Sequence, residues 1–121
     1  MSNSAFTVTG TVNAPTSAIV RAWANFSTQG GVVTIHSSYN VVSIVYNSVG
    51  NVTVTFTTGT FNDATYAAVC TTGGGSISGS PCYVRVPEDS DPTITTIRVQ
   101  ICGSTGAPSE APYCSMICMG N

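Results

Sequence analysis

The sequence predicts an all-β protein, an antiparallel β-sandwich or jelly-roll-like fold of about nine short strands. Three observations predict it. First, Val52, Val54 and Phe56 alternate with threonines over residues 51–57, which is the period of two that a half-buried strand requires. Second, similar short runs rich in Val, Ile, Thr and aromatic residues recur at close spacing, bounded by Gly, Pro, Asn or Ser. Third, no segment places apolar residues at helical spacing behind a capping residue. Closely spaced short strands are typical of sandwiches and jelly rolls.

The nine expected strands are Phe6–Val12, Ile19–Ser27, Val32–Ser37, Val41–Tyr46, Asn51–Thr57, Thr65–Thr71, Cys82–Val86, Thr93–Cys102 and Tyr113–Met119. At 121 residues the chain suits one domain with a usable core. We expect residues 1–15 to form an N-terminal arm that holds the first strand, because Pro15 separates that strand from the next. Residues 16–121 are expected to form a single β-sandwich domain.

The charge balance excludes several classes of function. Only 7% of the residues are charged, and the chain has three arginines and no lysine. Nucleic-acid binding needs clustered Lys and Arg to neutralise phosphates, so we expect no nucleic-acid partner. No run approaches the ~18 apolar residues of a membrane span, so we expect no membrane insertion. The start of the chain has no signal-peptide pattern, which predicts synthesis in the cytoplasm. So few charges also give little protection against self-association.

Five cysteines show a repeated spacing. Cys70 and Cys82 are separated by 11 residues, and so are Cys102 and Cys114. If each pair flanks a hairpin loop, two disulfides can close the bases of the loops, with Cys118 free. Two alternatives stay open: five reduced, buried thiols, as a cytosolic origin favours, or a metal site, which the spacing fits poorly.

Two polar excursions between the expected strands, residues 71–81 and 103–112, are the candidate binding loops, because binding residues often lie on loops of a rigid scaffold. The candidate binding residues are Gly73, Gly74, Gly75, Ser76, Ile77, Ser78, Ser104, Thr105, Ser109 and Glu110. Two unremarkable surface loops are the alternative interpretation.

The residues that could carry chemistry do not form a recognisable site. His36, the single histidine, has no nucleophile motif to accompany it and is expected to face solvent or a neighbouring subunit. The acidic run Glu88–Asp91 lacks the pattern of a calcium loop, and a solvated connection explains it equally well. We therefore expect no catalytic residue, no cofactor and no metal site. Trp23 and the five tyrosines suit core or cross-strand packing, and sugar binding is not assigned from them alone.

Several segments, in this order, resemble the repeated β-module of bacteriophage tail-fibre and related virion proteins. They are RAWANF at Arg21–Phe26, VTIHSSYNVVSI at Val33–Ile44, GNVTVTFTT at Gly50–Thr58, NDATYA at Asn62–Ala67 and the closing run SMICMG at Ser115–Gly120. The resemblance covers about 50 continuous residues and the C-terminus.

This resemblance implies a non-enzymatic virion structural protein on the exterior of the phage particle, of tail-fibre or host-attachment type. It also implies a homotrimer that binds other virion proteins or a receptor on the host cell. Two alternatives stay open at this point: a capsid decoration (cement) protein that binds the phage shell, and a secreted adhesin stapled by its cysteines.

Overall fold

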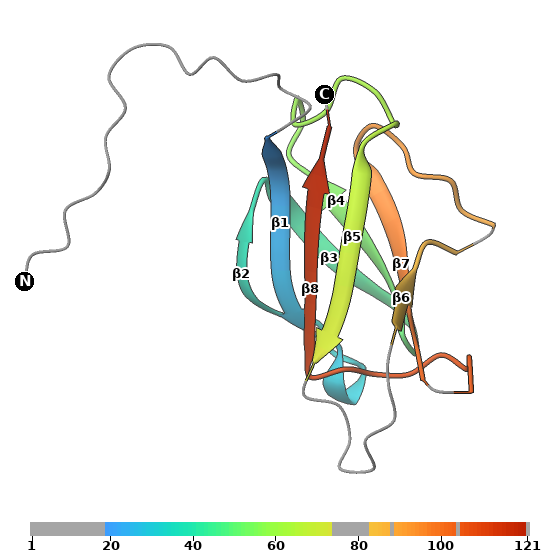
Figure 1. Ribbon diagram of the computed structural model, residues 1–121. Helices are drawn as coiled ribbons and strands as arrows, with labels where there is room; N and C mark the ends of the chain where they lie inside the picture. Colours follow the sequence, from blue (N-terminus) through green and yellow to red (C-terminus); the bar gives the residue numbers. More distant parts are fainter. Residues whose placement is uncertain (1–18, 74–82, 88, 104, 121) are drawn as a thin grey trace, which may run out of the picture.

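The computed structural model describes residues 19–73, 83–87, 89–103 and 105–120, which form two facing antiparallel sheets (Figure 1). Sheet A has the strand order β2-β1-β8-β5, and sheet B has the order β3-β4-β7-β6. The strands are β1 Val20–Ser27, β2 Thr34–Tyr39, β3 Val41–Ser48, β4 Asn51–Phe56, β5 Ala67–Gly73, β6 Tyr83–Arg85, β7 Thr96–Cys102 and β8 Tyr113–Met119. A 3₁₀ turn at Gln29–Gly31 joins β1 to β2, and the described residues contain no α-helix. The expected all-β antiparallel sandwich is confirmed.

The sequence located these strands well. Eight of the nine expected strands coincide with observed strands to within a few residues, and Tyr113–Met119 matches β8 at both ends. The ninth, Phe6–Val12 in the expected arm of residues 1–15, lies outside the described residues. The single chain does not test the expected homotrimer.

The core lies between the two sheets and is built by strict alternation. On β4, Val52, Val54 and Phe56 point inward, while Thr53 and Thr55 face outward. The neighbouring strands of sheet B and the facing strands of sheet A supply the other inward side chains, which are Ala22, Ala24, Phe26, Ile44, Ile97, Val99, Ile101, Cys114, Met116 and Cys118. Burying such side chains stabilises the fold by about 1.5–3 kcal/mol for each large aliphatic or aromatic group.

An aromatic cluster on and after β4 extends this core. The Phe61 ring stacks on Tyr66 with centroids 4.2 Å apart, and Phe56 meets both rings edge-on at 5.0 and 5.4 Å. The Tyr66 hydroxyl lies 2.9 Å from the carbonyl oxygen of Thr93. This hydrogen bond ties the segment before β5 to the segment before β7, so the cluster links the two sheets.

The connections that carry the cysteines are not hairpins. The chain passes from sheet A to sheet B between β5 and β6, and back to sheet A between β7 and β8. Cys102 and Cys114 therefore lie in different sheets, and both are free thiols. The structure contains no Cys102–Cys114 disulfide, and the hairpin on which that pairing was based does not form, because the β7–β8 connection changes sheet.

The structure describes only one end of the other expected bridge. Cys70 lies on β5 in sheet A and is a free thiol. Its proposed partner, Cys82, lies outside the described residues. Cys118 is free, as expected, but so are Cys70, Cys102 and Cys114, and the reduced alternative describes these four cysteines.

Candidate interaction face on sheet A

The outward side of sheet A carries a continuous row of exposed apolar side chains. Tyr39 on β2 pairs with Trp23 on β1, Trp23 pairs with Ile117 on β8, and Ile117 pairs with Val69 on β5. Their exposed fractions are 54%, 36%, 48% and 65%, respectively. These four residues, which we name the apolar row, cross the whole width of the sheet. Single exposed apolar residues are ordinary on protein surfaces, but a contiguous set marks an interaction site.

A row of uncharged hydrogen-bonding side chains runs beside the apolar row. Asn25 pairs with Ser37 on β2 and with Ser115 on β8, and Ser115 pairs with Thr71 on β5. The Asn25 side-chain amide donates a 2.7 Å hydrogen bond to Ser115 Oγ. This bond holds β1 and β8 side by side through their outward side chains, in addition to the backbone ladder.

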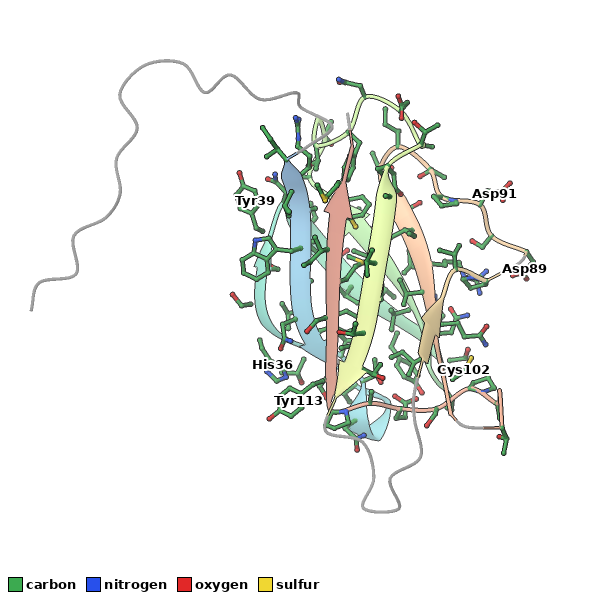
Figure 2. The ribbon with its side chains drawn as sticks, in the orientation of Figure 1. His36, Tyr39, Asp89, Asp91, Cys102 and Tyr113 are labelled. Atoms are coloured by element: carbon green, nitrogen blue, oxygen red, sulfur yellow. The ribbon has the colours of Figure 1, made fainter. Side chains whose placement is uncertain are left out.

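His36 and Tyr113 extend the exposed face toward its other end. Both side chains are exposed, and their ring centroids lie 5.6 Å apart with the ring planes tilted by 37°. Figure 2 shows the two labelled side chains close together at one end of sheet A, with Tyr39 toward the other end. Because β1 lies between β2 and β8, this contact reaches across β1. His36 is exposed in the single chain, which agrees with the expectation that it faces solvent or a neighbouring subunit.

The strands of sheet A are almost free of charge. Arg21 is the one charged residue in these four strands, and His36 is the one histidine. The outward side of sheet B is different, because Thr53, Arg98 and Asn51 lie there on β4 and β7. Arg98 donates a 3.3 Å hydrogen bond to Asn51 Oδ1, and Asn47 donates one of 2.9 Å to the same oxygen. The central strands of sheet B therefore carry hydrogen-bonded polar side chains on their outward side, where those of sheet A carry Trp23 and Ile117.

Most of the residues expected to bind on loops lie outside the described residues. Gly73 is the exposed last residue of β5, and Gly74, Gly75, Ser76, Ile77 and Ser78 lie outside the described residues, as does Ser104. Thr105 is exposed in a turn that is closed by a 2.9 Å hydrogen bond from Gly106 N to Gly103 O. These placements leave the prediction that the loops bind a partner untested.

Ser109 and Glu110 have a structural role that sequence reasoning missed. The backbone N–H of Ser109 donates to Ile101 O at 2.9 Å. One carboxylate oxygen of Glu110 accepts hydrogen bonds from the Tyr46 hydroxyl at 2.9 Å and from the Gly50 N–H at 3.0 Å. The bond from Tyr46 raises the pKa of that phenol. Glu110 therefore fastens the β7–β8 connection to the turn between β3 and β4.

Three thiols lie on the inward side of sheet A. Cys70 pairs with Met116, so Cys114 and Cys118 are its diagonal neighbours on β8. Burial raises the pKa of Cys70 to about 11, and burial together with the neighbouring Cys70 raises those of Cys114 and Cys118 to about 12. Thiols with such pKa values stay protonated at neutral pH, and a protonated thiol is a poor nucleophile and a poor metal ligand.

The remaining chemical groups are dispersed. The labelled Asp89 and Asp91 lie on the β6–β7 connection, on the opposite side of the view from Tyr39 and His36 (Figure 2), while Glu88 lies outside the described residues. Within the described ranges, no three His, Cys, Asp or Glu side chains gather as metal ligands do. In the same part of the chain there is no helix with the length and hydropathy of a membrane span.

Sequence reasoning named Trp23 and Tyr39 but did not recognise the apolar row. The signal was present in β8, where Tyr113, Ile117 and Met119 alternate with Cys114, Met116 and Cys118, so that both faces are apolar. In β1 the small Ala22 and Ala24 point inward, and the large Trp23 points outward.

Comparisons of the chain with protein-family models, with curated proteins and with solved structures find no match.

Proposed function

We propose that the chain is a bacteriophage virion structural protein: a surface-exposed β-module of tail-fibre or host-attachment type that acts by assembly and binding. The observation that carries the proposal is the outward side of sheet A, where the apolar row crosses four strands that contain a single charged residue. A contiguous exposed apolar surface of this kind is typical of a site that binds another protein surface. The segments that resemble phage tail-fibre modules supply β1 to β4 and most of β8, and thus both central strands of sheet A.

The chemistry of the described residues supports a binding role rather than catalysis. Burial raises the pKa values of Tyr66, Cys70, Cys114 and Cys118 well above neutral, so these groups stay protonated at physiological pH. The exposed His36 contacts the ring of Tyr113, and among the described residues no hydrogen bond joins it to a carboxylate or a thiol. General acid–base or nucleophilic catalysis requires such partners within hydrogen-bond reach.

The test is the presence and position of the chain in phage particles. Particles purified by density gradient are analysed by quantitative mass spectrometry and labelled with an antibody against the folded chain. We expect a few dozen copies or fewer per particle, with the antibody located at the tail. Several hundred copies on the shell would instead identify a capsid decoration protein. Complete absence from purified particles would overturn the proposal.

A further inference from the structure

The edge of sheet A at β2 has the features of a site that accepts a further strand. β2 pairs with β1 on one side, and no strand of the described residues pairs with its other side. An edge of this kind presents a row of backbone N–H and C=O groups that can pair with another strand. We propose that the segment Phe6–Val12 of the same chain adds to sheet A as a strand beside β2. The inference does not rest on the proposed function.

The sequence of β2 does little to prevent pairing at this edge. Proteins commonly protect an open edge with charged side chains, prolines or bulges. Residues 34–39, TIHSSY, contain no Asp, Glu, Lys, Arg or Pro. A bulge in the pairing of β2 with β1 is the one such feature of this strand. The edge is therefore open to a partner strand along most of its length.

An apolar side chain on the inner side of β2 lacks a cover. Ile35 pairs with Phe26, and directly paired residues point to the same side of a sheet. Phe26 is fully buried in the core, yet Ile35 is 40% exposed. On the opposite edge strand, β5, the inward-facing Ala68 and Cys70 are half-buried and pack against the core. The inner side of sheet A is therefore closed at β5 and open at β2.

The segment Phe6–Val12 has the side-chain pattern that this position requires. It reads FTVTGTV, so Phe, Val, Gly and Val alternate with three threonines. In an extended chain this alternation places the apolar side chains on one side and the hydroxyl groups on the other. With the apolar side turned toward the core, Val8 covers Ile35. The threonines then lie on the outward side of the sheet, beside the uncharged Ser37 of β2.

The connection to β1 is long enough for this placement. The Asn40 side-chain amide donates a 2.7 Å hydrogen bond to Arg21 O, so the start of β1 lies beside the end of β2 (Figure 1). A strand on the free side of β2 lies two strand spacings, about 10 Å, from β1. Residues 13–18, when extended, span about 20 Å. A strand that runs parallel to β2 therefore connects to β1 across the end of β2.

The short connection favours the segment of the same chain over that of a second copy. A short flexible tether holds a segment near its site at an effective concentration on the order of millimolar, which is highest when the tether length matches the span. A second copy would have to reach that concentration in solution. The edge at β5 is a poorer site for the same segment, because it lies three strand spacings, about 14 Å, from β1.

Amide hydrogen exchange of the full chain tests whether the edge is occupied. Val8→Asp places a carboxylate on the side that faces the core, so we expect the β2 amides that point away from β1 to exchange at least about 10-fold faster than in the wild type. Thr9→Asp places the same charge on the outward side and should leave their exchange unchanged. The amides of β4 report whether each variant stays folded. Equal exchange of the β2 amides in the wild type and a folded Val8→Asp would overturn the proposal.

A cysteine pair tests the arrangement even if Val8→Asp does not fold. The full chain carrying Val8→Cys and Ile35→Cys is oxidised at micromolar concentration, beside the wild type and each single variant. Peptide mass spectrometry and a denaturing gel without reductant then locate the new bond. We expect a disulfide between the two introduced cysteines within one chain, because neighbouring strands bring Cα atoms within the usual disulfide distance. Covalent dimers through these cysteines would show that the strand comes from a second copy and would overturn the proposal, as would the absence of a bond between them.

Discussion

Trp23 on β1 and Ile117 on β8 lie directly opposite each other on the outward side of sheet A, and both are exposed. They lie on the central strands of that sheet, so their exposure is not caused by fraying of an edge strand. Exposing a tryptophan and an isoleucine side by side offers no benefit to an isolated sandwich, because burying each would stabilise it by about 1.5–3 kcal/mol. The pair is explained if another surface covers it.

The buried thiols should resist modification in the folded protein. Cys114 and Cys118 are fully buried, and their raised pKa values keep them protonated at pH 8. Because alkylation requires the thiolate, we expect iodoacetamide at pH 8 to leave both unmodified for hours and to modify them within minutes in urea. Peptide mass spectrometry locates the label. Rapid labelling of Cys118 in the native protein, or a disulfide between any of Cys70, Cys114 and Cys118, would contradict the structure.

Stability should fall at alkaline pH. In the unfolded chain a thiol ionises near its ordinary pKa of 9.0, whereas in the folded chain Cys70, Cys114 and Cys118 ionise only near 11 to 12. Their contribution to stability is therefore complete below pH 9 and is lost as the pH rises from 9 toward 12. Each pH unit in this window costs about 1.4 kcal/mol per thiol. We expect a lower urea midpoint at pH 10 than at pH 7.5, with a smaller difference in Cys118→Ala.

Gly50 should not tolerate a side chain. Its φ is +67°, and a Cβ atom there would lie 2.5 Å from Ile101 O and 2.8 Å from Ser109 N. Gly59 also has a positive φ, of +87°, but its Cβ would meet nothing within 4 Å. Both substitutions carry the left-handed strain of about 1–2 kcal/mol, and overpacking adds about 1–3 kcal/mol at Gly50 alone. Urea unfolding should therefore show Gly50→Ala to be clearly less stable than Gly59→Ala, and equal losses would refute the close approach.

Removing the Glu110 carboxylate should loosen the β7–β8 connection. Glu110→Ala leaves the buried Gly50 N–H without its acceptor, which costs about 1–3 kcal/mol. Tyr46→Phe removes the other bond but leaves that N–H paired, so its cost should be near 1 kcal/mol or less. Urea unfolding compares the two variants, and amide exchange at Gly50 should accelerate in Glu110→Ala alone. A larger loss in Tyr46→Phe would contradict this role for Glu110.

The sequence predicted the strands better than their assignment to sheets. Alternation within Asn51–Phe56 located β4 because one face is apolar and the other polar. The chain order could not show that the β5–β6 and β7–β8 connections change sheet, and the matched cysteine spacing suggested hairpins instead. The sequence did not reveal the apolar row for a related reason. On β8 both faces are apolar, so periodicity alone cannot tell which side of the strand is buried.

The central claim is that this chain assembles with its own copies, and the most direct test is the mass of the purified wild type in solution. Sedimentation equilibrium at micromolar concentration should give about three times the chain mass of 12.4 kDa, because the resemblance to tail-fibre modules implies a homotrimer and assembly would cover the exposed apolar row of each copy. A single species of 12.4 kDa over the whole micromolar range would contradict the account.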